Sequence, residues 1–385
     1  MEQYIEGLDV FTGQPIGVTY NDEKIINVSS ISTDGALLSW LAPGLFDLQI
    51  NGYMGYDFNS DELTASNVQA ITKALLQIGV TAYLPTIITN SDENISKLIG
   101  VIVEACHIDE LTRSCIKGIH IEGPFISPVD GARGAHDIQY VKAPCWELVS
   151  RWQQEAQGLI KLITISPEWD KAESFIRQCV ENGIEVSIGH TTANSLQINN
   201  AVRAGARLST HLGNGAQLQL PRHPNYIWDQ LAEDELAPTV IADGFHLPYN
   251  VLKVFMKAKP EQIMLVSDAV HLCGMKPGQY KTHIGGDVTL TEEGKLYLTN
   301  HPNMLAGSAV SLLSCVNYVV QHQLAPLAAA WEMASLRPAK SMNLDIATGI
   351  ESNAPADMVL FRNDGKSIII QEVIKCGKNV FRNEL

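Results

Sequence analysis

Short apolar segments alternate with segments of helical periodicity along most of the chain. Between residues 45 and 270 this alternation repeats eight times, with expected strands at residues 45–50, 81–88, 115–122, 159–166, 184–190, 206–212, 238–244 and 262–268. Helical periodicity and capping residues mark residues 91–106, 170–183 and 194–205 between them. Alternating strands and helices form parallel sheets with right-handed crossovers, and eight units over roughly 250 residues is the size of a (β/α)8 barrel. The pattern therefore predicts an α/β protein with a TIM barrel.

The two ends of the chain follow a different pattern, in which strand-like runs are separated by turn residues. These runs cover residues 2–11, 15–20, 23–30, 357–361 and 367–381. We interpret them as a small β-sandwich domain built from residues 1–42 and 346–385, packed against the barrel of residues 43–345. A glycine-rich stretch at 271–305 predicts a hairpin inserted after the last barrel strand. Two further helices are expected near 308–322 and 326–343.

Composition narrows the classes of function. The 385 residues are 45% hydrophobic and 18% charged, as in globular proteins, and carry a net charge of −15. Such an acidic chain is not expected to bind nucleic acid or an anionic membrane surface. No run approaches the roughly 18 apolar residues of a membrane span, and the first residues do not resemble a signal peptide. Seven scattered cysteines without a C-x-x-C pair are typical of reduced thiols, so we expect a cytoplasmic protein.

Polar residues gather at the carboxyl ends of the expected strands, where barrel enzymes carry their active sites. Glu122, His190 and His211 end the third, fifth and sixth strands. One carboxylate and two imidazoles form a ligand set for a catalytic, zinc-type metal with an open position. Asp268 ends the last strand, where a carboxylate can take a proton from water and return it to a leaving group. Each residue alone fits a packed histidine or a capping acid, but together they predict a metal-dependent hydrolase.

A set of motifs in a fixed order resembles the N-acetylglucosamine-6-phosphate deacetylase family of the amidohydrolase superfamily. The resemblance spans about residues 43–345 and rests on "PGLFDLQINGYMGYDF", "GIHIEGPFISPVDGARGAH", "IGHTTAN", "STHLGNGA", "IADGFHLP", "LVSDA" and "LAGSAVSL". It implies hydrolysis of the N-acetyl group of an amino sugar phosphate, giving glucosamine 6-phosphate and acetate from N-acetylglucosamine 6-phosphate. A terminal β-domain also fits this family.

The resemblance also implies roles for individual residues. Glu122, His190 and His211 would hold one divalent metal ion, zinc or iron, and Asp268 would be the general acid and base. The other expected site residues would contact the substrate: His136, counted as catalytic, beside the acetamido carbonyl, His246 at the sugar, Asn214 and Gly215 in the phosphate-binding stretch, and Arg222 as an arginine lent across a homodimer interface.

Asp47, Gln49 and Asn51 place three polar side chains on one face of the first strand. Related hydrolases carry H-x-H at the positions of Gln49 and Asn51, where it holds a second metal. Neutral amides bind zinc more weakly than imidazole does. We therefore expect one metal per chain, with Gln49 and Asn51 as hydrogen-bonding groups near water or substrate and Asp47 deeper in the barrel.

Three alternatives remain open. The sixth strand reads "HLGNGAQ", whereas the family motif is closer to H-L-F/Y-N-A-M, so the substrate could be a non-phosphorylated N-acetyl sugar or another N-acyl compound. N-acyl-amino-acid or cyclic amide hydrolases usually carry H-x-H on strand one and a lysine on strand four, which this chain lacks. A sugar-binding protein without catalysis would be expected to have lost Asp268 or a metal ligand.

Overall fold

Eight parallel strands form the centre of the molecule. The computed structural model describes residues 1–32 and 38–383. The strand order is β14-β13-β12-β11-β10-β9-β8-β5, and a parallel bridge between Ile50 and Ala269 brings the two edges together. The strands are β5 (Leu45–Ile50), β8 (Val80–Ile88), β9 (Ile119–Glu122), β10 (Ile160–Ile165), β11 (Glu185–Ile188), β12 (Leu208–Ser209), β13 (Ala237–Val240) and β14 (Met264–Leu265). The predicted (β/α)8 barrel is confirmed.

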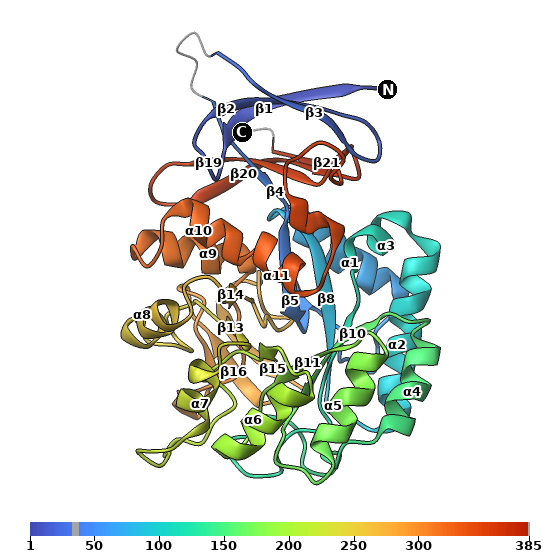
Figure 1. The fold of residues 1–385 in the computed structure, drawn as a ribbon, viewed down its shortest axis with the longest axis vertical. Coiled ribbons are helices and arrows are strands. Elements are labelled where there is room, and N and C mark those ends of the chain that lie inside the picture. The colour runs from blue at the N-terminus through green and yellow to red at the C-terminus, as the bar shows by residue number, and fades with distance from the viewer. Residues whose placement is uncertain (33–37, 384–385) are drawn as a thin grey trace.

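Helices surround the barrel on its outer side (Figure 1). They are α1 (Ala65–Leu76), α2 (Asp92–Ile108), α3 (Glu110–Cys115), α4 (Trp146–Glu155), α5 (Ala172–Glu181), α6 (Ser195–Ala204), α7 (Tyr226–Ala232) and α8 (Tyr249–Ala258). Side-chain caps begin several of them, as at Ser91 before α2 and Asn194 before α6. The three helices expected at 91–106, 170–183 and 194–205 are α2, α5 and α6. No helix of the described residues has the length and apolar character needed to cross a membrane.

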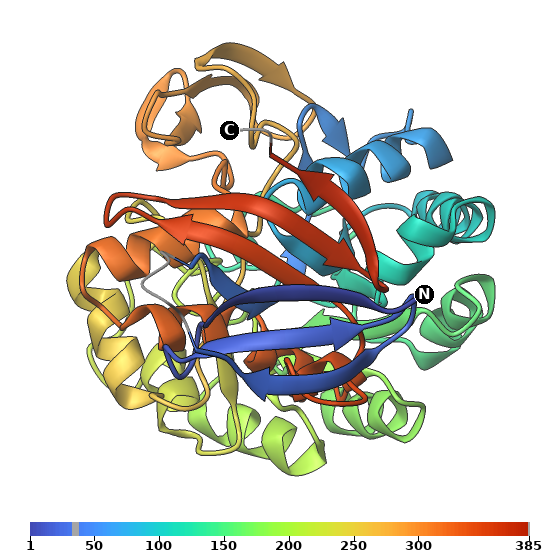
Figure 2. The ribbon, with the colours of Figure 1, turned by 90° about the horizontal axis from the view of Figure 1, so that it is seen from above.

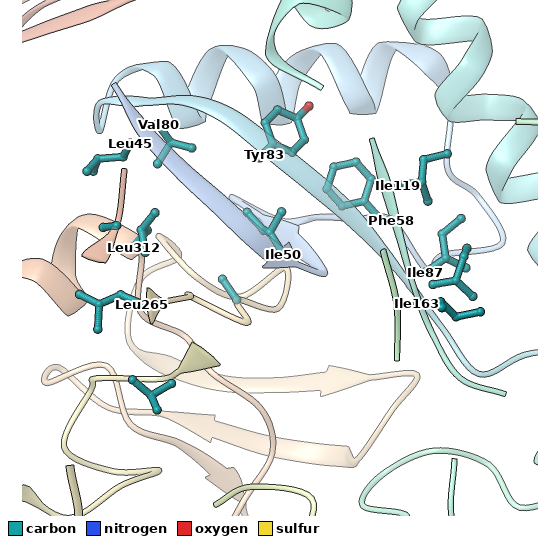
Figure 3. Packing of buried hydrophobic residues seen from close by; sticks show 14 of the residues in the cluster. Leu45, Ile50, Phe58, Val80, Tyr83, Ile87, Ile119, Ile163, Leu265 and Leu312 are labelled. Carbon is teal, nitrogen blue, oxygen red and sulfur yellow. The ribbon is translucent and has the colours of Figure 1, made fainter. Parts of the chain in front are cut away.

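The buried apolar residues of the barrel strands fall into two separate clusters. Leu45 and Ile50 of β5 belong to the cluster between strands and helices, which Figure 3 shows together with Val80, Tyr83 and Ile87 of β8. Phe46 and Leu48, also of β5, belong to the second cluster, which includes residues of four other barrel strands, β8, β10, β12 and β14. Side chains of a strand alternate between its two faces, so this second cluster fills the barrel interior.

The terminal strands form one sheet of seven strands in the order β21-β20-β19-β4-β1-β2-β3. They are β1 (Gln3–Asp9), β2 (Pro15–Tyr20), β3 (Ile25–Ser30), β4 (Trp40–Pro43), β19 (Met358–Asn363), β20 (Ile368–Lys375) and β21 (Lys378–Arg382). In Figure 1 β1–β3 lie above β19–β21, and the view from above shows the two groups of strands side by side (Figure 2). An apolar cluster joins residues of both groups, including Val18, Ile25, Met358 and Ile374. The predicted β-sandwich from both termini is confirmed, and β4 adds a strand that the sequence pattern did not predict.

The terminal sheet packs near the amino ends of the barrel strands. Gly79, directly before β8, lies against Val359 and Ile370 of that sheet. Residues 33–37 and 384–385, which the predicted terminal domain includes, lie outside the described residues. The domain limits at 42/43 and 345/346 stay a prediction.

Two expected elements differ from the structure. The stretch 271–305 holds a four-stranded antiparallel sheet, which is larger than the hairpin expected there. Its strands are β15 (Gly278–Thr282), β16 (Gly286–Leu290), β17 (Leu296–Leu298) and β18 (His301–Leu305). The helix expected at 326–343 is divided into α10 (Leu327–Met333) and α11 (Leu336–Ser341), because Ser335 leaves helical geometry and Pro338 cannot continue the hydrogen bonding of α10. The remaining elements are α9 (Leu312–Gln321), η1 (Asp345–Thr348), β6 (Gly52–Tyr53) and β7 (Tyr56–Asp57).

Candidate active site

Four of the expected site residues lie at the carboxyl ends of barrel strands. Glu122 is the last residue of β9, His190 and His211 lie two residues after the ends of β11 and β12, and Asp268 follows β14. Glu122 and the two histidines are buried, whereas Asp268 keeps some exposure at the barrel mouth. Strands far apart in the sequence thus bring one acid, two imidazoles and a second acid to one place, as the sequence pattern predicted.

The three proposed metal ligands form a compact triangle. Glu122 Oε1 lies 3.3 Å from His190 Nε2 and 2.9 Å from His211 Nε2, and the two nitrogens are 3.1 Å apart. Atoms that bind zinc tetrahedrally at about 2.0–2.1 Å lie about 3.3 Å from one another. Burial would raise the pKa of Glu122, but the hydrogen bonds and charges of His190 and His211 hold it well below its usual range. The donor set therefore fits a divalent metal ion.

The surroundings of His190 direct its Nε2 atom toward that triangle. Its Nδ1 lies 2.9 Å from the carbonyl oxygen of Ala132, which can only accept, so Nδ1 carries the proton. Nε2 then keeps its lone pair for a metal, as in most metal-binding histidines. Two glycines pack closely against the ring. A Cβ at Gly215 would lie 2.6 Å from His190 Nδ1, and a Cβ at Gly134 would lie 3.1 Å from His190 Cε1. Larger residues at these positions would displace the ring.

Three site residues have left-handed backbone geometry. His190 and Asp268 have φ of 47° and His211 has φ of 28°. Such geometry costs a non-glycine residue of order 1–3 kcal/mol and often occurs at functional sites. In each case the chain turns sharply just after a barrel strand, which aims the side chain across the mouth. Surrounding contacts must hold these turns, such as the 2.8 Å bond from the His211 amide to Thr239 Oγ1.

Asp268 is held through one of its two carboxylate oxygens. Its Oδ1 accepts hydrogen bonds from Asn51 Nδ2 at 2.7 Å and Gln49 Nε2 at 3.1 Å, and Gln49 Nε2 also donates to Glu122 Oε1 at 2.8 Å. Oδ2 is left for other partners. Burial, followed by the charge of Glu122, raises the pKa of Asp268 to about 6, which suits a group that must exchange protons near neutral pH. Gln49 thus donates its two amide hydrogens to Glu122 and Asp268.

His136 stands at the edge of the same cluster. Its ring centroid lies 4.5 Å from that of His190, and one ligand atom each of Glu122, His136 and His190 lie within 4.8 Å of one another. Burial, followed by the charge of His190, lowers the pKa of His136 to about 3, so the ring is neutral. His136 Nδ1 lies 2.8 Å from Thr89 Oγ1. When the Thr89 hydroxyl donates to Nδ1, the single ring proton sits on Nε2.

The residues expected around the substrate are less closely gathered. Asn214 donates from Nδ2 to the His211 carbonyl at 3.2 Å, and Gly215 touches His190, so both line the metal side of the site. His246 pairs through Nδ1 with Asp243 Oδ2 at 2.7 Å. Arg222 is exposed, and within residues 1–32 and 38–383 its side chain makes no ion pair or hydrogen bond. The structure thus brings Asn214 and Gly215 into contact with the proposed metal ligands, whereas the printed contacts of His246 are with Asp243.

The sequence pattern missed some residues that orient the site. Thr89 follows β8 directly and bonds His136, and the carbonyl of Ala132 fixes His190. Thr89 lies one residue past the end of its strand, where a polar residue is a recognisable signal. The Ala132 contact is made by a backbone carbonyl, which no residue type in the sequence reveals. A separate surface cavity of about 390 Å³ lies between the loop after β10 and α6, lined by residues such as Trp169 and Asn200. None of the expected site residues line it.

Comparison with known proteins agrees with this geometry. The amidohydrolase family model matches residues 40–380. The N-acetylglucosamine-6-phosphate deacetylase of Bacillus subtilis (strain 168) is 31% identical over 368 residues, which cover 91% of this chain and 90% of that protein. The enzyme of the same name from Mus musculus is 32% identical over 331 residues, which cover 83% of this chain and 79% of that protein.

Solved structures give the same result at the level of the fold. N-acetylglucosamine-6-phosphate deacetylase from Pasteurella multocida has a TM-score of 0.86 and 25% identity, covering 100% of both chains. The enzyme of the same name from Thermotoga maritima has a TM-score of 0.85 and 25% identity, covering 99% of this chain and 100% of that one. The family model, the sequence relatives and the shared fold lead to one conclusion: the chain belongs to the amidohydrolase family, within its group of N-acetylglucosamine-6-phosphate deacetylases.

Proposed function

We propose that this protein hydrolyses the N-acetyl group of an amino sugar phosphate, converting N-acetylglucosamine 6-phosphate and water to glucosamine 6-phosphate and acetate. The observation that carries this proposal is the triangle of Glu122, His190 and His211 beside the partly open carboxylate of Asp268. The relatives named above support the choice of substrate.

One divalent metal ion, zinc or iron, would be held by Glu122, His190 and His211. When bound, it would supply Lewis-acid stabilisation of the acetyl oxygen and activation of water. A second ion at β5 is disfavoured, since Gln49 and Asn51 donate N–H groups to Asp268 and, for Gln49, also to Glu122. Their amides act as hydrogen-bond donors that hold the acid in place.

Asp268 moves the proton in two steps. Its ionised carboxylate takes a proton from the attacking water as the oxygen bonds to the acetyl carbon, and it then gives that proton to the departing nitrogen. Oδ2 is the oxygen placed for this, because two amides occupy Oδ1. The neutral His136 would donate from Nε2 to the carbonyl oxygen as negative charge develops there. The C–N bond breaks, and the products are an amine and acetate.

An N-acetyl sugar without phosphate is the second candidate. Arg222, the expected phosphate partner, is exposed and unpaired in the described part of the chain, and the chain carries a net charge of −15. A phosphate would need Asn214 and backbone N–H groups at one end of the site, with Arg222 supplied from a second copy.

We propose a homodimer, because Arg222 would then reach the phosphate from the second copy. We also propose that the protein is cytoplasmic, which the scattered cysteines support.

Acetate release by the purified, metal-loaded protein tests the activity. We expect turnover of N-acetylglucosamine 6-phosphate that disappears after a chelator removes the metal and returns when zinc or iron(II) is added. The kcat/KM for N-acetylglucosamine with and without the 6-phosphate, and for the galactosamine and mannosamine epimers, separates the two candidates. Equal values with and without phosphate would contradict the phosphate assignment. Absence of acetate release from every sugar would contradict the deacetylase itself. Light scattering measures whether the protein is a dimer.

A further inference from the structure

The loop after β10 carries an acid whose two carboxylate oxygens both accept hydrogen bonds. Glu168 Oε1 accepts from Ser127 Oγ at 2.7 Å, and Oε2 accepts from the backbone N–H and the hydroxyl of Thr192, both at 2.6 Å. Ser127 lies in the loop after β9 and Thr192 in the loop after β11, and these strands flank β10 in the barrel. One carboxylate thus joins the loops of three neighbouring strands. We call Glu168, Ser127 and Thr192 the Glu168 clamp.

The clamp encloses the turn that carries a proposed metal ligand. Thr192 lies two residues after His190 in the chain. Ser127 donates its backbone N–H to the His190 carbonyl at 2.8 Å. Hydrogen bonds therefore run from His190 through Ser127 to Glu168 and on to Thr192, from which the chain returns to His190. Ser127 also follows Glu122 along the loop after β9, so the clamp connects the loops of two proposed ligands.

The turn at His190 needs support from its surroundings. Its φ of 47° is unfavourable for a residue with a side chain, and it persists only where neighbouring contacts hold it. Hydrogen bonds to a carboxylate are stronger than those between neutral groups. Ser127 is fully buried, so a polar group left unpaired there would be costly. The clamp thus supplies strong contacts on both sides of the turn.

Glu168 acts on the site from outside it. It is half-buried and lines the surface cavity described above. Within the described residues, its side chain bonds Ser127 and Thr192 and none of the proposed metal ligands. Any effect of Glu168 on a metal ion must therefore pass through the backbone of the loops that it joins.

We propose that Glu168 is a positioning residue, which holds the His190 turn in the geometry that directs Nε2 toward the metal ion. This inference rests on the proposed function, because it takes His190 as a metal ligand. The role requires hydrogen-bond acceptors at fixed places and no contact with the substrate. Removing the acceptors should therefore weaken and distort metal binding, whereas keeping them without the charge should preserve it.

Glu168→Ala and Glu168→Gln together test the clamp. In E168Q, Oε1 can accept from both Thr192 donors and Nε2 can donate to Ser127 Oγ, whereas in E168A all three donors lose their acceptor. We expect the affinity of the metal-free protein for Co²⁺, measured by competition with a chelator, to fall about 10- to 100-fold in E168A. E168Q should stay close to the wild type. Wild-type affinity in E168A, or an equal loss in both variants, would overturn the proposal.

The visible absorption of bound Co²⁺ separates a displaced ligand from a general loss of stability. The band positions and intensities report the arrangement of the ligands, so they should change in E168A and stay as in the wild type in E168Q. Trp331→Ala removes a fully buried side chain on α10, far along the chain from these loops, and should keep the wild-type spectrum. An unchanged spectrum in E168A, or the same change in W331A, would refute the positioning role.

Glu173→Ala is the matched control for loss of an acid. Glu173 on α5 lines the same surface cavity and accepts a hydrogen bond from Asn200 Nδ2 at 2.8 Å. E173A should keep the wild-type affinity for Co²⁺ and the wild-type spectrum. A loss in E173A as large as that in E168A would show that the acids of the cavity, and not the clamp, are responsible.

Ser127→Ala and Thr192→Val are milder variants that do not depend on the folding of E168A. Each removes one hydroxyl from Glu168 and leaves the backbone N–H in place. Both should weaken Co²⁺ binding in the same direction as E168A, and wild-type affinity in both would overturn the proposal. If the wild type itself bound no Co²⁺, the proposed function would fail. Binding that is equal in the wild type and E168A would refute only the positioning role.

Discussion

Asp268 depends on its neighbours for both its geometry and its protonation. Its Oδ1 is occupied by the amides of Gln49 and Asn51, and burial with the charge of Glu122 raises its pKa to about 6. The sequence pattern identified this acid because it ends the last barrel strand. It also identified the two amides, but it could not show that they bond the acid, since β5 and β14 are more than 200 residues apart in the chain.

Asp268→Asn should abolish proton transfer while leaving the metal site intact. Asn keeps an oxygen for the Gln49 and Asn51 donors, and Asp268 is not among the three proposed metal ligands. We expect kcat to fall roughly 10²–10⁴-fold, the usual contribution of a general acid and base, with metal content by mass spectrometry unchanged. Asp61→Asn, at an exposed position before α1, serves as control. Near-normal turnover in D268N would show that another group moves the proton.

Gly215→Ala should weaken metal binding through His190. A Cβ at this position would lie 2.6 Å from the imidazole, so the ring must move away from the Glu122 and His211 atoms. We expect a metal affinity about 10- to 100-fold lower, measured by competition with a chelator, as for other changes beside metal ligands. Gly183→Ala is the matched control, because Gly183 has a similar φ of 72° but no neighbour within 4 Å. Equal affinity in G215A and G183A would show that the contact does not hold the ring.

At the scale of elements, hydroxyl groups connect four barrel strands beneath the site. His120 Nε2 on β9 lies 2.8 Å from Thr164 Oγ1 on β10, which lies 2.7 Å from Thr210 Oγ1 after β12, and Thr210 donates to Ser187 on β11 at 2.6 Å. Burial lowers the pKa of His120 to about 4, so this ring is neutral. The sequence pattern predicted these strands, but their cross-strand hydrogen bonds depend on register. This series of hydrogen bonds forms a polar layer directly below the proposed metal ligands.

Thr164→Val should destabilise the protein without changing side-chain shape. The substitution leaves His120 Nε2 and the Thr210 hydroxyl without their buried partner, which costs about 1–3 kcal/mol in the free energy of unfolding. Urea unfolding followed by circular dichroism measures the change. Thr289→Val is the control, because its hydroxyl pairs with Thr299 at 3.0 Å in the half-buried inserted sheet. A loss no larger than that of T289V would mean that the hydroxyl chain adds little.

The inserted sheet and the divided helix show where element prediction from pattern was incomplete. Residues 271–305 carry many glycines and polar residues, so the pattern of short antiparallel strands with little alternation predicts only a hairpin. Their apolar residues are few: Val288, Leu290 and Leu296 form a small cluster with Leu272 and Ala309. The strands of such a small sheet are ordered mainly by pairing with one another. The local sequence of each strand is only a weak signal of this pairing.

At the scale of the whole molecule, Trp331 on α10 links the barrel to the terminal sheet. Its ring stacks on Phe361 of β19 with centroids 4.4 Å apart and planes at 5°, and its Nε1 donates to the Pro43 carbonyl of β4 at 2.8 Å. Trp331 is fully buried. This contact holds the sheet at the end of the barrel away from the site, so the terminal domain supports the barrel without touching the chemistry.

Trp331→Ala should loosen that link. Removing a fully buried aromatic side chain costs about 3–5 kcal/mol in the free energy of unfolding, and the Pro43 carbonyl loses its donor as well. Chemical unfolding of the metal-loaded protein measures the loss. Trp228→Ala on α7 is the matched control, because Trp228 is 49% exposed, and its loss should stay within about 0.5 kcal/mol. Equal stability of the two variants would show that the terminal sheet docks independently of Trp331.

The sequence by itself determined the barrel, the sandwich from both ends, and the acids and histidines of the site. These follow from local information: the apolar period, the turn residues, and the polar side chains that end parallel strands. The tertiary structure decided the rest, because tautomers, shared hydrogen bonds and contacts with glycine depend on which strands lie side by side. Thus the ring proton of His190, the single held oxygen of Asp268 and the pairing of Asp243 with His246 emerged only once the chain was folded.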